Sequence, residues 1–154
     1  MSKVNLHEAR QLLSQRLTCE DSPDWAPLKG YKGFLSTSCG LLDTNGKSTR
    51  LIADLEFRRS PKTNVIRYVF SVYRRELRQG LERVYQLDVS QWPRPVKDLH
   101  QLPHEHMGDE RTVGADHWSK WTYEEVLAYF CAQTNITFIP VVPHPEELRL
   151  KGQK

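Results

Sequence analysis

Two histidines and several charged residues lie close together in the segment Leu102–Gly114, which reads LPHEHMGDERTVG. His104 and His106 are two residues apart, so in an extended backbone both imidazoles point to the same side. An unperturbed histidine pKa of about 6.5 lets one imidazole accept a proton while another donates one, which suits phosphodiester cleavage. Because the segment has neither helical nor strand periodicity, we expect a polar loop, a kind of element that often carries catalytic residues.

The same histidine pair allows two other interpretations. As metal ligands, the two imidazoles would need further partners, for which the candidates are His100, Asp109, Glu110 and His117. A lone H-x-H is a weak metal signature, and the histidines could also hydrogen-bond the loop backbone or face solvent. The chain has no P-loop, GxGxxG, HExxH or GxSxG motif. We therefore predict neither a metal nor a cofactor.

One carboxylate and two arginines complete the candidate catalytic set. Asp88 lies near the exit of a predicted strand, on the approach to the histidines. An arginine such as Arg83 or Arg111 would offset negative charge on a transition state. The candidate catalytic residues are therefore His104, His106, Asp88, Arg83 and Arg111.

A second set of candidate residues is basic and lies at predicted strand ends. Guanidinium groups bind phosphates in a bidentate manner, and tyrosines between them can stack on unpaired bases. The arginines expected to contact nucleic acid are Arg58, Arg59, Arg74, Arg75 and Arg78. Consecutive antiparallel strands should bring Arg74, Arg75, Arg78 and Arg83 together. Charged strand edges also prevent aggregation, and Glu76 and Glu82 dilute the positive charge, so a structural role is the alternative.

The elements that must position these residues are strands between Tyr31 and Gln91. Side chains there alternate with a period of two, and Asn45-Gly46 is a strong hairpin signal. Short connections favour antiparallel neighbours. The predicted strands are 31–38, 50–59, 65–75 and 81–89, with a short further strand at 136–142. The strand 65–75 has apolar residues on both faces, so we expect it to be central.

Helices are predicted before and after these strands. Asn5 followed by Glu8 resembles a capping box and predicts a helix over 5–18, while Thr122 and Glu125 form a T-x-x-E capping box for a helix that ends near Asn135. Residues 92–121 are expected to be a long irregular connection. The resulting fold class is α+β, with an antiparallel meander of four to five strands and both helices packed on one face. We predict a single domain over 1–154, with a loose tail at 146–154.

Composition sets limits on location and partners. The net charge is only +3 over 154 residues. Cys19, Cys39 and Cys131 are odd in number and form no CxxC pair, so we expect reduced thiols and a cytoplasmic protein. The chain has no apolar run of about 18 residues, so no membrane contact is predicted.

Four segments follow one another in a recognisable order: LIADLEFR from Leu51, the triplet Tyr68-Val69-Phe70, the strand end Tyr85-Gln86-Leu87-Asp88, and Pro103-His104-Glu105-His106. This order, over about 51–106, resembles the TumE-like toxin family of bacterial toxin–antitoxin pairs. In that family an Arg-Tyr-Asp segment with nearby histidines precedes a proline–histidine stretch. Here Gln86 stands where the arginine would be, and Gln91-Trp92 offers no histidine pair. The resemblance implies a toxin with RNA-directed activity and an antitoxin partner.

We therefore predict a small RNA-acting protein, a toxin-type, metal-independent endoribonuclease that uses histidine acid–base chemistry. The alternative is a non-enzymatic protein-interaction module, such as an immunity protein or a phage or mobile-element accessory protein. Its sheet edge or its histidine loop would then bind a protein partner. RNA and an antitoxin-like protein are the expected partners, and the sequence leaves the oligomeric state open.

Overall fold

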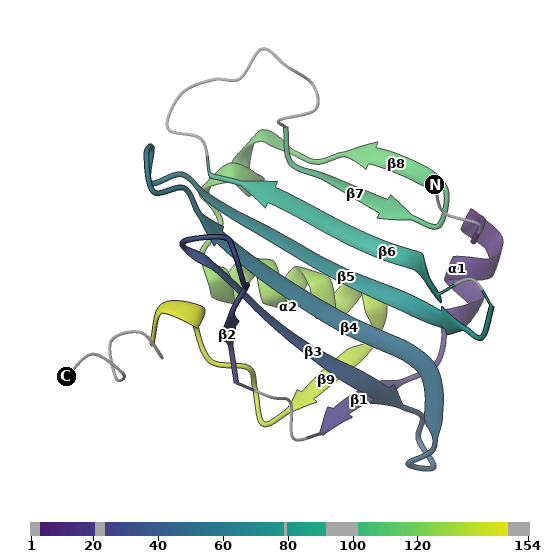
Figure 1. Cartoon of the computed structure of the whole chain (residues 1–154). Coiled ribbons are helices and arrows are strands. Elements are labelled where there is room, and N and C mark those ends of the chain that lie inside the picture. The colour runs from purple at the N-terminus through teal and green to yellow at the C-terminus, as the bar shows by residue number, and fades with distance from the viewer. Residues whose placement is uncertain (1–3, 21–23, 79, 92–101, 148–154) are drawn as a thin grey trace.

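One mostly antiparallel sheet dominates the computed structural model, which describes residues 4–20, 24–78, 80–91 and 102–147 (Figure 1). Its strand order is β8-β7-β6-β5-β4-β3-β1-β9, with β2 paired to β3. The strands are β1 (Leu17–Glu20), β2 (Ala26–Pro27), β3 (Phe34–Leu42), β4 (Ser48–Arg59), β5 (Ile66–Glu76), β6 (Gly80–Ser90), β7 (His104–Met107), β8 (Glu110–Val113) and β9 (Ile136–Ile139). The helices are α1 (Leu6–Leu12), the short 3-10 helix η2 (Asp116–Lys120) and α2 (Tyr123–Thr134).

The central strands β3 to β6 form the predicted antiparallel meander. Each pairs with the next, and β5 pairs with β6 from Arg67↔Ser90 to Glu76↔Gly80. Every second residue of β4 is buried, as Leu51, Ala53 and Leu55 illustrate. The α+β class, the antiparallel meander and the central position of β5 are therefore confirmed.

The predicted number of four to five strands is wrong, because the described residues form nine. The segment 104–113, expected to be a loop, is a hairpin of β7 and β8. Its turn contains Gly108 at φ +58, and a Cβ there would meet the Asn5 carbonyl oxygen. Both strands are only four residues long, and all of β8 is exposed, so neither shows apolar alternation. Of the predicted loop 92–121, residues 92–101 lie outside the described part.

The first helix is shorter than predicted. Asn5 caps α1 by accepting a hydrogen bond from the Glu8 backbone N–H, as expected, but the helix ends at Leu12 rather than near residue 18. Residues Leu17–Glu20 instead form β1, parallel to β9 and antiparallel to β3. Leu17 and Cys19 are buried while their neighbours are not, and this period of two fits a strand.

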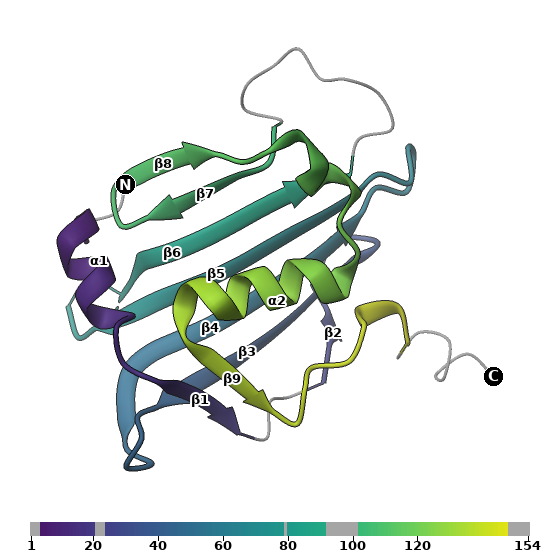
Figure 2. The ribbon, with the colours of Figure 1, turned by 180° about the vertical axis from the view of Figure 1, so that it is seen from behind.

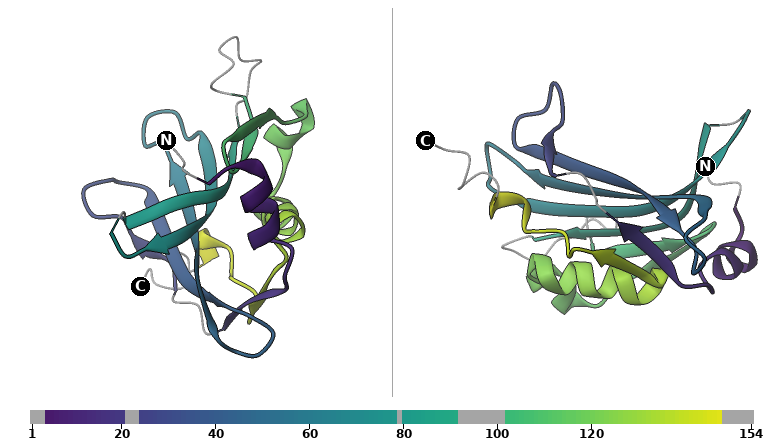
Figure 3. Two further views of the ribbon diagram at one scale, coloured as in Figure 1. Left: turned by 90° about the vertical axis from the view of Figure 1, so that its right-hand side faces the viewer. Right: turned by 90° about the horizontal axis from the view of Figure 1, so that it is seen from below.

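Helix α2 has the predicted ends and covers one face of the sheet (Figure 2). Thr122 and Glu125 form the capping box, and Asn135 follows the helix in a left-handed conformation. The Phe130 ring lies 5.7 Å from that of Phe70 and 5.9 Å from that of Tyr85. The opposite face carries no helix among the described residues, and we call it the open face (Figure 3).

Cys19 and Cys39 form a disulfide between β1 and β3, so the expectation of reduced thiols is wrong for this pair. The two residues are 20 apart in sequence, but antiparallel pairing of their strands brings their Cα atoms to 6.1 Å. Among the described residues, the remaining cysteine is Cys131, on α2. No described helix is long and apolar enough to cross a membrane. Most of the predicted tail 146–154 lies outside the described residues.

We expect one reactive thiol, that of Cys131, when the protein is unfolded without reductant. In the folded protein this thiol should react slowly, because burial raises its pKa to about 11. A thiol titration with and without denaturant measures the number of reactive thiols and the rate at which Cys131 reacts. A Cys131→Ser variant should have no reactive thiol. Closing a loop of this length stabilises by roughly 3 kcal/mol, so a Cys19→Ser/Cys39→Ser variant should lose up to about that free energy of unfolding. Three reactive thiols in the unfolded, unreduced protein would contradict the disulfide.

Candidate active site

Side chains on the open face form rows across the sheet. Away from the register shifts at Gly40/Leu42 and Val72/Tyr73, a residue of one strand lies beside its partner on the next. One row consists of Ser38, Asp54, Ser71, Gln86, His106 and Arg111, from β3 to β8. The row beside it consists of Ser36, Glu56, Val69, Asp88, His104 and Val113. A polar surface therefore runs across six strands and ends at the histidine pair.

The two histidines lie side by side on β7. His104 pairs with Asp88 of β6, and His106 pairs with Gln86. Their ring centroids are 5.0 Å apart and the rings are nearly perpendicular. The prediction that both imidazoles point to the same side is confirmed, because this segment is extended.

The Asp88 side chain is buried, with only 6% exposed, and it lies beside Arg67 and His104. Arg67 donates from Nε to one carboxylate oxygen at 2.9 Å and from Nη2 to the other. The hydrogen bond from Arg67 to Asp88 raises the pKa of the guanidinium, so Arg67 stays charged. The Nε2 atom of His104 lies 3.8 Å from the second Asp88 oxygen. A protonated His104 would therefore form an ion pair with Asp88.

His104 is oriented by the backbone. Its Nδ1 donates a hydrogen bond to the Leu102 carbonyl oxygen, with 2.9 Å between the two atoms. Because a carbonyl oxygen can only accept, Nδ1 carries a proton. Nε2 is thus the nitrogen that faces Asp88.

His106 is held in its neutral form. Burial, followed by the positive charges of Arg83, His104 and Arg111 in that order of effect, lowers its pKa to about 4. At neutral pH the ring is therefore neutral, with one protonated and one unprotonated nitrogen. A neutral imidazole beside two guanidinium groups can accept a proton from a substrate that those groups hold.

The five candidate catalytic residues lie on three neighbouring strands. Asp88 and Arg83 are on β6, His104 and His106 on β7, and Arg111 on β8, where it pairs with His106. The structure brings them together on the open face, next to the free edge of β8. Their predicted roles remain proposals.

The arginines expected to contact nucleic acid are not gathered into one patch. The Arg74 guanidinium pairs with Glu8, Glu76 and Glu82, and the Glu8 contact places it on the side of α1. Alternation puts Arg75 on the opposite face, and Arg78 is exposed in the turn that follows β5. The expected cluster at this hairpin therefore does not form, because neighbouring residues of a strand face opposite sides.

The other two arginines lie at the far end of β4 and already have acidic partners. Arg58 pairs with Glu56 at 2.6 Å, and its guanidinium carbon lies 5.3 Å from the centre of the Phe34 ring. Arg59 binds both carboxylate oxygens of Glu146. Of the two, Arg58 lies on the open face.

Sequence reasoning missed two residues that hold the site. The sequence predicts a strand that contains Arg67, but it does not predict the contact with Asp88. The two residues lie on the two strands of one hairpin, at nearly equal distances from its turn. Glu105 lies on the other face of β7 and accepts hydrogen bonds from the Tyr85 and Tyr129 hydroxyls at 2.7 and 2.6 Å. Burial, reinforced by the Glu105 carboxylate, raises the pKa of both tyrosines.

The candidate metal ligands do not converge. Among the described residues no group of three or more histidine, cysteine, aspartate or glutamate side chains is placed to hold a metal ion. Asp109 accepts a hydrogen bond from the Leu6 backbone N–H at 3.0 Å and so caps the start of α1. His100 lies outside the described residues.

Comparison with family models, curated proteins and solved structures finds no match to this chain.

We expect His106 to titrate at about pH 4, well below an ordinary histidine. Arg83→Gln should raise this pKa because it removes a nearby positive charge, while Arg78→Gln, in the exposed turn, should leave it unchanged. Histidine-resolved NMR titration measures both. A His106 pKa of about 6.5 in the wild-type protein would contradict this description of the site.

The same pKa predicts how stability depends on pH. Because the folded protein holds His106 at a pKa below its unfolded value, the unfolded chain binds more protons between about pH 6.5 and pH 4. His106 should therefore lower the free energy of unfolding as the pH falls through this window. Urea unfolding at pH 7 and pH 4.5, compared between the wild type and His106→Gln, isolates this effect. An equal loss in both proteins would show that other groups cause it.

Proposed function

We propose that this chain is a small RNA-acting protein that cleaves phosphodiester bonds by histidine acid–base chemistry. The observation that carries the proposal is the arrangement of His104 and His106, with ring centroids 5.0 Å apart, beside two arginines on a helix-free sheet face. No cofactor is needed for the steps below, because each acid, base and cation is a side chain of this chain.

Substrate binding and proton transfer are linked in this site. A phosphate group would be attracted by Arg83 and Arg111, whose positive charges lower the pKa of His106. The bound phosphate offsets those charges and so raises the pKa of His106. The imidazole becomes a stronger base when the substrate is present than when the site is empty.

The reaction would be an attack of the ribose 2′-oxygen on the adjacent phosphorus. Neutral His106 takes the 2′-hydroxyl proton, the new bond from oxygen to phosphorus forms, and the bond from phosphorus to the 5′-oxygen breaks. Protonated His104 gives its proton to the departing 5′-oxygen, which leaves a 2′,3′-cyclic phosphate. Asp88 stabilises the imidazolium form of His104 before this transfer, and the arginines offset charge on the transition state.

A second proposal, a protein-interaction function, is supported by β8. This strand is at one edge of the sheet, all four of its residues are exposed, and Val113 is 47% exposed. An extended peptide can add to such an edge. A partner bound there would lie against Arg111 and close to the histidine pair, so an antitoxin-like protein would also block cleavage. A cytoplasmic location, as expected for a toxin and its antitoxin, is part of this second proposal.

The two functions differ in what accompanies the purified protein. Size-exclusion chromatography with and without nuclease treatment separates them. Nucleic acid that is removed by nuclease supports the first, and a protein complex that survives nuclease supports the second.

We predict that the protein cleaves a short single-stranded RNA and leaves DNA of the same sequence intact, because DNA lacks the 2′-hydroxyl. His104→Ala and His106→Ala should each lower the cleavage rate by about 100-fold or more. His7→Ala is the matched control, since His7 is exposed on α1. Rates are measured on a fluorescently labelled RNA, and circular dichroism checks that each variant is folded. A folded His104→Ala/His106→Ala variant with full activity would refute the proposal.

A further inference from the structure

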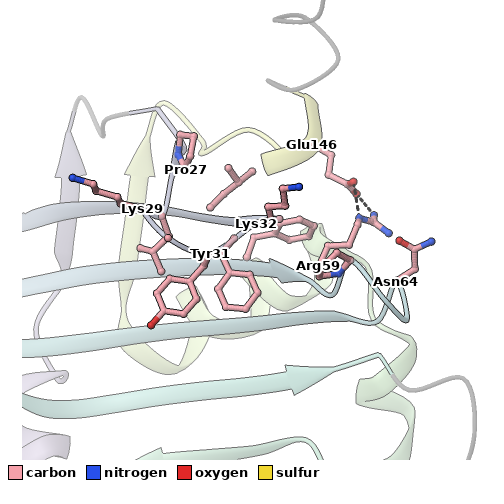
Figure 4. Close-up of a pocket in the computed structure, with 14 residues that line it drawn as sticks. Pro27, Lys29, Tyr31, Lys32, Arg59, Asn64 and Glu146 are labelled. Carbon is pink, nitrogen blue, oxygen red and sulfur yellow. Dashed lines mark hydrogen bonds and ion pairs between the residues drawn. The ribbon is translucent and has the colours of Figure 1, made fainter.

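A second candidate site lies at the end of the sheet where β3 begins and β4 ends, and its lining includes Phe34 from the open face and Arg59 from the α2 face. The loop before β3, the end of β4 and the turn after it surround an open hollow of about 920 Å³ (Figure 4). The lining residues that matter here are Lys29, Tyr31, Lys32, Phe34, Arg59 and Asn64. None of them takes part in the chemistry proposed for the histidines.

The centre of the hollow is an exposed aromatic stack. The Tyr31 ring lies 5.4 Å from the Phe34 ring, with an angle of 11° between the planes. Phe34 thus covers one side of Tyr31, yet Tyr31 is still 60% exposed. A tyrosine ring that is covered on one side and open on the other can stack on a planar ligand.

The loop that carries Tyr31 is already fixed in place. The Leu28 N–H donates to the Phe34 carbonyl at 2.8 Å, the Tyr31 N–H donates to the Leu28 carbonyl at 3.1 Å, and the Arg59 N–H donates to the Gly33 carbonyl at 3.0 Å. Gly33 has φ +78, and a Cβ there would meet the Arg59 carbonyl oxygen. The ring therefore needs little ordering when a ligand binds, which removes part of the cost of binding.

The charges around the ring favour an anion. Lys29 and Lys32 extend to different sides of Tyr31 (Figure 4). The charge of Arg59 is offset by Glu146, to which it donates two hydrogen bonds. The two lysines thus leave an excess of positive charge. Asn64 also lines the hollow, and its side-chain amide can donate and accept hydrogen bonds to the edge of a planar heterocycle.

We propose that this hollow binds one unpaired nucleotide of single-stranded RNA. The base stacks on Tyr31, and its phosphates lie near Lys29 and Lys32. This inference rests on the proposed function for its choice of RNA rather than another anion with an aromatic ring.

The strand register connects the hollow to the histidine pair. Phe34, Arg58, Arg67 and Ser90 are successive partners across β3, β4, β5 and β6. Arg67 holds Asp88, which lies opposite His104 on β7. From β3 to β7 is four strand spacings, about 19 Å, a distance that a few nucleotides span. RNA anchored at Tyr31 can therefore cross the open face and place a phosphate at the histidines.

Binding of a labelled 2′-fluoro RNA hexamer tests the inference. This RNA has no 2′-hydroxyl, so it binds without being cleaved. Tyr31→Ala should weaken the affinity by about 5- to 150-fold, as expected for the loss of one base stack. Tyr31→Phe keeps the aromatic ring and should change the affinity by less than about 3-fold.

Salt dependence separates the stack from the charges. Lys29→Gln/Lys32→Gln should reduce the slope of log affinity against log salt concentration, while Tyr31→Ala should leave that slope unchanged. Hexamer binding that is the same in Tyr31→Ala and wild type would overturn the inference. So would adenosine monophosphate binding as tightly as the hexamer, because the hollow would then serve a free nucleotide.

The two proposals can fail separately. If the wild type cleaves RNA through His104 and His106 but Tyr31→Ala binds the hexamer normally, the hollow is not part of the RNA site. If hexamer binding depends on Tyr31 but no RNA is cleaved, the binding site stands and the nuclease proposal falls.

Discussion

The candidate active site depends on the carboxylate of Glu105. It is fixed from the core side by the Tyr85 and Tyr129 hydroxyls, which come from β6 and α2. Side chains of a strand alternate between faces, so a one-residue shift of β7 would turn both histidines toward the core and Glu105 toward solvent. The two tyrosine hydrogen bonds therefore fix the register of a strand only four residues long. They also explain how a short hairpin at the sheet edge can hold two histidines in a defined position.

Charge is distributed unevenly over the open face. In its middle, Arg58 pairs with Glu56 and Arg67 pairs with Asp88, so these charges largely cancel. The two ends of the face carry further cationic side chains, which are Arg83 and Arg111 near His106 and Lys29 and Lys32 near Tyr31. A polyanion would be attracted at both ends and meet hydrogen-bonding groups between them. This arrangement favours an extended ligand over a compact one, and it would make binding sensitive to salt.

The sequence predicted the parts of this fold whose local pattern is strong. Strands β3 to β6 alternate clearly, and α2 has a capping box at its start and Asn135 at its end. The elements that were missed are short or depend on distant partners. β1 forms because β9 lies beside it, and the β7–β8 hairpin is held by β6 and α1.

The candidate site was predictable only where neighbours in sequence are also neighbours on the sheet. The order of the chain predicted that Asp88 lies near the histidines. The spacing of His104 and His106 predicted that both imidazoles point to the same side of the strand. The stack of Tyr31 on Phe34 could not be foreseen, because two positive-φ glycines fold the loop that forms it. Arg74 was misjudged for a different reason. Its strand position was correct, but its side chain faces three carboxylates on the side of α1 rather than the open face.

The position of α1 gives this short helix a role in the site. Asp109, in the β7–β8 turn, accepts a hydrogen bond from the first N–H of α1, where a carboxylate is favoured by the helix dipole. Gly108 precedes Asp109 in the same turn. Its N–H donates to the Val84 carbonyl at 2.7 Å, and it lies so close to the Asn5 backbone that a Cβ would not fit. The hairpin turn is thus clamped between α1 and β6, while Glu105 is held from the core. Because no strand of the described residues pairs with the outer side of β8, these two anchors are what keep His106 and Arg111 on the same face.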